Sequence, residues 1–189
     1  MAYPDRMAIE SEWTSEMVLA LPEDGIRREL LDGELVVMTA PSLLHQNVVD
    51  ELHDRLKTYV RAHEIGSAHL SPADIEFSPR RLVQPDVFVA PLVDGRKARS
   101  WNEIHALLLA VEVTSPSTAR YDRITKRHIY LSEPVDEYWI IDLDARLVER
   151  WRHGDERPEV LDASITWQPA ASIPALTIDL EAMFDSALS

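Results

Sequence analysis

Gln84-Pro85-Asp86-Val87-Phe88-Val89 and the run at 107–113, Leu-Leu-Leu-Ala-Val-Glu-Val, each carry one carboxylate within an apolar stretch. A strand buried on both faces reads as such a near-continuous apolar run. An ionised carboxylate inside it is costly unless it is paired or holds a metal ion. The two runs therefore predict strands of one sheet, on which Asp86 and Glu112 share a divalent cation.

The segment after the second run, residues 117–130, has the spacing of a helix. The residues expected on one side of this helix are Tyr121, Ile124, His128 and Leu131. Lys126 lies about two turns into the helix, and its long side chain can bend back over the end of the sheet. Asp86, Glu112 and Lys126 then form a constellation suited to cutting a phosphodiester.

Composition narrows the class of protein. With 189 residues and 46% apolar content, we expect one domain, 1–189, that is large enough to bury a core. The sequence contains no run of 18 uncharged apolar residues and no signal-peptide pattern at its start, so we expect a cytoplasmic protein without a membrane segment. The absence of cysteine excludes disulfides and thiolate zinc sites.

The formal net charge of −14 argues against a nucleic-acid surface that covers the whole molecule. Its distribution is uneven, because residues 80–129 carry nine basic and five acidic side chains while the segments on either side are strongly acidic. The cationic segment is the one that holds the candidate site. The alternative is that the acidic balance serves solubility and that the local excess is chance.

The pattern along the chain indicates a mixed α/β protein with a central sheet. A short helix is expected at 13–21 and a long amphipathic helix from just after Ser42, on which Leu44, Val48, Leu52, Leu56 and Tyr59 are apolar. The expected strands are 34–38, 73–78, 86–90, 107–113, 137–142 and 148–152, the last pairing antiparallel with the one before it. Residues 1–11 are expected to be frayed, and 155–189 to form a short edge strand and a terminal helical turn.

Hard divalent cations take oxygen ligands and keep several waters, so two carboxylates and one carbonyl suffice to hold an ion beside a phosphate. Asp86, Glu112 and the carbonyl of Val113 are the expected ligands, with Mg²⁺ as the expected ion and Mn²⁺ as its substitute. Lys126 would orient or help deprotonate the attacking water and stabilise charge on the phosphorus.

Each of these residues also has a purely structural interpretation. Asp86 could satisfy backbone N–H groups where its strand begins. Glu112 could form a buried ion pair with a helix arginine. Lys126 could belong to a solvated helix face.

Several motifs, in order, resemble a known family. Asp86 after Pro85, followed by Glu112, resembles the split PD-(D/E)XK nuclease signature. The resemblance is closer to the Uma family of restriction endonuclease-like proteins, and it covers a core of about residues 14–152. The segments that carry it are 29–35 (Glu-Leu-Leu-Asp-Gly-Glu-Leu), His45-Gln46, 84–87, 111–118, Asp122 with Lys126, Tyr130, and 137–142 (Glu-Tyr-Trp-Ile-Ile-Asp).

The resemblance implies a restriction-endonuclease-like core, a divalent metal and hydrolysis of DNA phosphodiesters. Asp86 and Glu112 match the metal-binding pair. The chain departs from the signature at Thr114, which stands where the motif lysine would be. In this family the basic group comes from the following helix, which points to Lys126, with Arg123 and Arg127 as substitutes.

Two further site residues are expected by the same resemblance. Glu29 fits an acidic residue that such nucleases contribute from an early helix, as a direct or water-mediated metal ligand; the alternative is a surface acid that balances Arg27 and Arg28. His45 would face the site only if the long helix packs there, and is otherwise a helix-cap or core histidine. Tyr130, like other aromatic residues on apolar positions, is expected in the core.

DNA is the expected partner, bound through Arg120, Arg123 and Arg127, and a homodimer is expected by analogy because two-fold dimers are the commonest assemblies. The leading hypothesis is a metal-dependent endonuclease. The alternative is a catalytically silent relative that binds nucleic acid or protein, which the net charge and Thr114 favour. A sugar hydrolase that uses a carboxylate pair is disfavoured, because Phe88 is the one aromatic residue near Asp86 and Glu112 in the sequence. The sequence also has no dinucleotide-binding or P-loop glycine motif.

Overall fold

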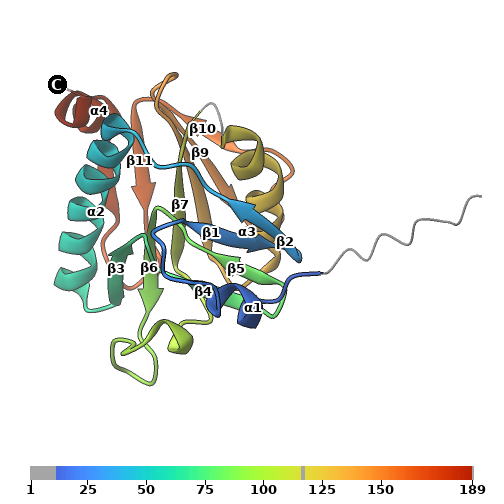
Figure 1. The fold of residues 1–189 in the computed structure, drawn as a ribbon. Coiled ribbons are helices and arrows are strands. Elements are labelled where there is room, and N and C mark those ends of the chain that lie inside the picture. Colours follow the sequence, from blue (N-terminus) through green and yellow to red (C-terminus); the bar gives the residue numbers. More distant parts are fainter. Residues whose placement is uncertain (1–11, 116–117, 189) are drawn as a thin grey trace, which may run out of the picture.

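The molecule is built around one mixed sheet whose strands are the apolar runs of the sequence (Figure 1). The computed structural model describes residues 12–115 and 118–188. The strands of the central sheet are β3 (Gly66–Leu70), β6 (Val87–Pro91), β7 (Leu109–Thr114), β8 (Glu137–Asp142), β9 (Leu147–Arg152) and β10 (Glu159–Leu161). Their order is β10-β9-β8-β7-β6-β3, and every neighbouring pair is antiparallel except β7 with β8. The predicted mixed α/β class is confirmed.

One face of the central sheet is covered by two helices, α2 (Leu43–His63) and α4 (Leu180–Leu188), as Figure 1 shows. The small antiparallel ribbon of β11 (Ser164–Trp167) and β12 (Leu176–Asp179) joins this layer. Alternate strand residues such as Val87, Val111 and Trp139 point to this side and are fully buried. Period-two alternation thus sends one set of apolar side chains into each layer.

The opposite face packs against a second, four-stranded antiparallel sheet and a helical segment. The sheet has the order β2-β1-β5-β4, with β1 (Arg28–Leu31), β2 (Glu34–Val37), β4 (Ile75–Ser78) and β5 (Arg81–Val83). The helical segment is a π-helical turn, η2 (Tyr121–Lys126), continued by α3 (Arg127–Ser132). Two short helices, α1 (Ser15–Leu19) and the 3₁₀ turn η1 (Trp101–Glu103), complete the described chain.

The long predicted helix is confirmed as α2. It begins after Ser42, whose hydroxyl accepts the N–H of His45 at 3.2 Å and so satisfies one of the free donors of the first turn. Val48, Leu52 and Leu56 are fully buried, as the spacing predicts. Leu44 is 52% exposed, so the buried stripe begins one turn later than predicted.

The face predicted for the helix after β7 is wrong at two of its four positions, since Tyr121 and Leu131 do pack against the core. Ile124 is 53% exposed and His128 is also exposed, while Asp122 and Lys126 are almost completely buried. Because the segment Tyr121–Lys126 is π-helical, its side chains follow a wider turn than the helical spacing assumed. The helix therefore presents its charged residues to the sheet, which the apolar pattern could not indicate.

Two other predictions need correction. The segment from Glu29 to Gly33, for which no strand was expected, contains most of strand β1, which pairs with β2 as a hairpin around Asp32 and Gly33. The C-terminal region forms three strands and a nine-residue helix rather than one edge strand and a turn. The expectation for residues 1–11 lies outside the described residues, as do residues 116 and 117. No helix in the described part of the chain is long and apolar enough to cross a membrane.

Candidate active site

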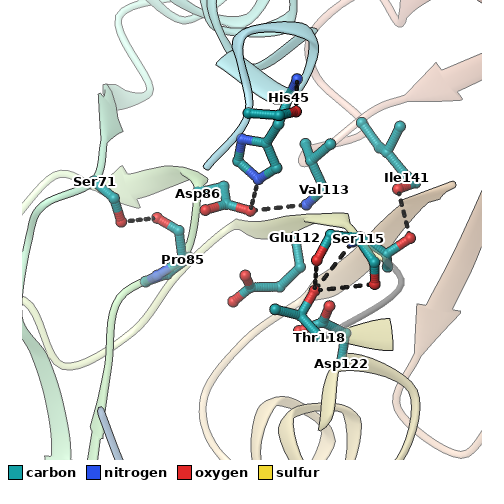
Figure 2. Close-up of polar contacts among 12 residues, drawn as sticks. His45, Ser71, Pro85, Asp86, Glu112, Val113, Ser115, Thr118, Asp122 and Ile141 are labelled. Atoms are coloured by element: carbon teal, nitrogen blue, oxygen red, sulfur yellow. Dashed lines mark hydrogen bonds and ion pairs between the residues drawn. The ribbon is translucent and has the colours of Figure 1, made fainter. Parts of the chain in front are cut away.

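Asp86 and Glu112 lie together because they continue the pairing of β6 with β7. Val87 of β6 faces Val111 of β7, so one further step along this antiparallel register brings Asp86 opposite Glu112. Side chains opposite one another in such a pair have Cβ atoms about 4.5–5.5 Å apart. Both residues are buried and both line one cavity. Figure 2 shows both side chains at this end of the two strands.

The cavity has a volume of about 320 Å³. It opens between the end of β7, the first turn of α2, the segment 38–42 and the loop after β8. The ionisable side chains that line it are Arg27, His45, Asp86, Glu112, Asp122 and Asp144. Glu29 and Lys126 are absent from this lining and lie behind it.

Asp86 is held by three donors. Its Oδ1 accepts Arg27 Nη1 at 2.9 Å, and its Oδ2 lies 2.9 Å from the backbone N of Val113 and 3.1 Å from His45 Nε2 (Figure 2). Burial alone would raise the pKa of Asp86, but the hydrogen bond to His45 and the charge of Arg27 outweigh it and hold this pKa well below its usual value. Asp86 is therefore ionised throughout the neutral range.

A shared, partly dry site would by itself give both carboxyl groups raised pKa values, but the pKa of Asp86 is lowered. The sequence prediction did not include Arg27. Its guanidinium pairs with Asp86 and neutralises the charge of that carboxylate.

Glu112 has the opposite electrostatic environment. Burial raises its pKa well above the usual value; Lys126 lowers it, while Asp86 and Glu29 raise it further. Its Oε1 accepts the hydroxyl of Tyr130 at 2.8 Å and lies 3.0 Å from Lys126 Nζ. Its Oε2 has no hydrogen bond to any residue that the structure describes, which leaves that oxygen available to a ligand in the cavity.

Lys126 lies within the site rather than on a solvated helix face. Its side chain is completely buried, with Nζ 2.8 Å from Glu29 Oε2, 3.0 Å from Glu112 Oε1 and 3.9 Å from Asp122 Oδ1. Burial alone would lower the pKa of Lys126, but the charges of Glu112, Glu29 and Asp122 raise it above the usual value. The ammonium is thus held in its protonated form at neutral pH.

Glu29 does not reach the cavity as a metal ligand would. It lies on strand β1 and not on an early helix, and it is fully buried. Its Oε1 accepts the backbone N–H of Gln84 at 2.8 Å, and its Oε2 faces Lys126. The interpretation of Glu29 as a surface acid is also wrong, because it is the internal counter-ion of Lys126.

His45 faces the site, because the first turn of α2 packs over the end of β6. Its Nε2 contacts Asp86, and its Nδ1 is buried without a hydrogen bond among the described residues. Thr114 uses its hydroxyl to donate to the carbonyl of Ile141 at 3.3 Å, so it supplies no substitute for a lysine. Val113 lines the cavity, with its N–H donated to Asp86.

The arginines predicted to bind DNA differ in their surroundings. Arg123 is paired with Asp142 at 2.7 Å and with Glu149 at 2.6 Å, and Arg127 lies 4.7 Å over the ring of Trp151. Arg120 is exposed and has no ion pair with any described residue. Binding of a phosphate by Arg123 would compete with two carboxylates, so its contribution is expected to be the weakest of the three.

Sequence reasoning missed Arg27, Asp122 and Tyr130 as members of the site. Tyr130 was expected in the core and is buried there, but its hydroxyl also contacts Glu112. The spacing of Asp122, Lys126 and Tyr130, each four residues after the last, was the signal that could have placed all three on one helix face. Nothing in the local sequence distinguishes Arg27 from its neighbour Arg28.

The pH dependence of stability tests this description of Asp122. Burial raises the pKa of Asp122 to about 6, against 3.8 in its ordinary state. The folded protein thus binds the proton more tightly than the unfolded chain, so the stability that Asp122 contributes is full below pH 3.8 and is lost as pH rises to about 6. By that shift the loss is about 3 kcal/mol.

The unfolding free energy of Asp122→Asn should therefore decrease less between pH 4.5 and pH 7 than that of the wild type. Both are measured by urea denaturation in the presence of EDTA. The control is Asp144→Asn, which changes an exposed carboxylate at the rim of the same cavity. A fall of equal size in Asp122→Asn and in the wild type would show that Asp122 is ionised without cost.

Two comparisons with known proteins gave matches. The profile of the family Uma2, described as "Putative restriction endonuclease", matches residues 15–181. Among solved structures, the chain is similar to a protein from Anabaena variabilis described as "a putative nuclease belonging to DUF820", with a TM-score of 0.76 and 20% identity over 92% of this chain and 98% of that chain. At this identity the likeness shows a shared fold. A search of curated proteins gave no match. Since the profile spans most of the sequence, the protein belongs to the Uma2 family.

Proposed function

We propose that this protein is a metal-dependent endonuclease that hydrolyses DNA phosphodiester bonds by a PD-(D/E)XK-type mechanism. The observation that carries the proposal is the contact between Glu112 and Lys126 beside Asp86, at the end of two paired strands. The lysine comes from the helix after β7 instead of from position 114. Membership of a family described as restriction endonucleases supports DNA as the substrate class.

The residues of the site fit a divalent cation. Within the described part of the chain, four carboxylates, Glu29, Asp86, Glu112 and Asp122, lie around two permanent cations, Arg27 and Lys126. With all four ionised the cluster carries a charge of −2, which a divalent ion would neutralise. The carboxylates that line the cavity, Asp86, Glu112, Asp122 and Asp144, offer the oxygen ligands that Mg²⁺ and Mn²⁺ prefer.

The ligands proposed for the ion are the carboxylates of Asp86 and Glu112 and the carbonyl of Val113. No group of three or more His, Cys, Asp or Glu side chains in the described ranges is arranged to hold a metal ion. A site of two carboxylates is consistent with this finding, because Mg²⁺ usually keeps several water ligands. When bound, the ion supplies Lewis acidity at the phosphate.

The protein's own residues have distinct roles in this mechanism. Tyr130 and Lys126 both contact Oε1 of Glu112, which fixes the carboxylate with Oε2 free for the ion. His45 and the N–H of Val113 hold Oδ2 of Asp86, whose Oδ1 contacts Arg27. Asp122 lines the cavity with a pKa of about 6, suited to accept a proton from the attacking water at neutral pH. Water then attacks phosphorus, the bond to the leaving oxygen breaks, and solvent protonates that oxygen.

Cleavage of supercoiled plasmid DNA tests the proposal. We expect nicked and linear products with Mg²⁺ or Mn²⁺ and none with EDTA, and we expect Asp86→Asn to remove the activity while Asp144→Asn at the rim retains it. Equal products with and without metal, or in the Asp86→Asn variant, would identify a contaminating nuclease. If intact DNA is bound but never cut, the protein is instead the catalytically silent binding module. Cutting both strands with one site per chain would suit a two-fold dimer.

A further inference from the structure

The two permanent cations of the site face in different directions. Lys126 is completely buried, with its ammonium between Glu29 and Glu112, and it does not line the cavity. Glu112 and Asp122, which both line the cavity, lie between it and the ammonium. Arg27 lines the cavity, and its side chain is 20% exposed. Among the described residues that line the cavity, Arg27 is the only Arg or Lys.

The guanidinium of Arg27 is fixed in place at one end and has donors to spare. Its Nη1 donates to Asp86 Oδ1 at 2.9 Å, and its Nη2 donates to the carbonyl of Gln84. Its Nε is buried and has no hydrogen bond among the described residues. A guanidinium has five N–H groups in a planar fork, which matches the oxygens of a phosphate.

The backbone around Arg27 holds the side chain over the cavity. Arg27 immediately precedes β1, and its carbonyl accepts the N–H of Met38, which closes the base of the β1–β2 hairpin at 3.0 Å. Arg28, the next residue, points elsewhere: its Nη1 and Nη2 contact Asp24 at 2.8 and 2.6 Å, and it does not line the cavity. Strand alternation thus directs Arg27 to the cavity and Arg28 to Asp24, outside it.

We infer that Arg27 is the catalytic cation that contacts the scissile phosphate, whereas Lys126 is a positioning residue that acts through Glu112. The inference rests on the proposed function, because the phosphate is that of the proposed DNA substrate. It deepens that proposal, because the phosphate contact expected of the motif lysine is assigned to a side chain at the start of the β1–β2 hairpin. Arg27 also connects phosphate binding with metal binding, because it contacts Oδ1 of Asp86, a proposed metal ligand.

The test measures phosphate contact separately from cleavage. A short fluorescein-labelled DNA duplex is titrated with protein in Ca²⁺, chosen as a divalent ion that is larger than Mg²⁺ and binds with a different geometry. Fluorescence anisotropy then gives the Kd for wild type, Arg27→Gln, Arg27→Lys and the matched control Arg28→Gln. Single-turnover cleavage of the same duplex in Mg²⁺ is measured in parallel, and thermal melting verifies that each variant is folded.

Arg27→Gln is expected to raise the Kd at least tenfold, and Arg28→Gln to change it less than threefold. Arg27→Lys keeps the charge but loses the fork, so its binding should recover in part while its cleavage rate stays at least tenfold below wild type. This variant keeps the inference testable if Arg27→Gln does not fold.

Equal Kd values for wild type and Arg27→Lys, with equal cleavage rates, would overturn the inference, as would a wild-type protein that does not bind the duplex. The proposed function can fail separately. If the wild type binds in an Arg27-dependent manner but does not cleave in Mg²⁺ or Mn²⁺, the endonuclease proposal fails while the phosphate contact of Arg27 stands.

Discussion

Replacing Glu112 with glutamine is expected to lower the rate of DNA cleavage by a factor on the order of 10³ or more, equivalent to about 4 kcal/mol of transition-state stabilisation. The amide keeps the shape of the side chain but removes the negative charge that the proposed ion requires. The rate is measured in single-turnover experiments with Mg²⁺.

The same substitution is expected to change the free energy of unfolding by no more than about 2 kcal/mol, because burial already disfavours the ionised form of Glu112. Lys126 retains Glu29 as its partner at 2.8 Å. The matched control is Glu34→Gln, on the exposed side of β2, which should leave both rate and stability unchanged. Loss of cleavage accompanied by a much larger loss of stability would show that Glu112 is mainly half of a structural ion pair.

Replacing Lys126 with methionine is expected to destabilise the folded protein by about 3–5 kcal/mol, because two carboxylates would remain buried without their shared cation. Glu29 and Glu112 both lie within 3.0 Å of the ammonium, and neither has another cation as near. For a chain of this size the melting temperature should fall by roughly 10 °C.

A double-mutant cycle separates this mechanism from a simple loss of packing. If unpaired charge is the cause, adding Glu29→Gln to Lys126→Met should restore part of the lost stability, with a coupling of about 1 kcal/mol or more. Lys97→Met, at an exposed position, is the control for loss of a lysine. Purely additive losses in the double variant would contradict the ion-pair account.

The sequence contained enough information to predict the central pair of the site. Asp86 and Glu112 stand out because each interrupts an apolar run, and the structure places them opposite one another along the β6–β7 register. The central sheet and the long helix α2 were predictable for the same reason, since both carry a clear periodic pattern. The position of Lys126 in the helix after β7 and its place beside Glu112 were also predictable, although its contact with Glu29 was not.

The errors share a physical cause. The helix that holds Lys126 was assigned an apolar inner face, but Ile124 faces solvent and Asp122 faces the site. A buried charged cluster reverses the rule that relates polarity to exposure, so a pattern of apolar residues gives the wrong side. Arg27 was missed because its place depends on the hairpin β1–β2 packing against the end of β6, a contact that no local pattern encodes.

A single crystallographic measurement tests the central claim, which is that Asp86 and Glu112 share a divalent cation. Crystals soaked in Mn²⁺ should show an anomalous difference peak in the cavity, about 2.1–2.5 Å from an oxygen of each carboxylate. Arg27 should then be displaced from Asp86 Oδ1, with which it is in contact at 2.9 Å. The same soak of Glu112→Gln crystals should show no peak. A wild-type cavity without a peak at saturating Mn²⁺, or a peak bound elsewhere with Arg27 still on Asp86, would contradict the claim.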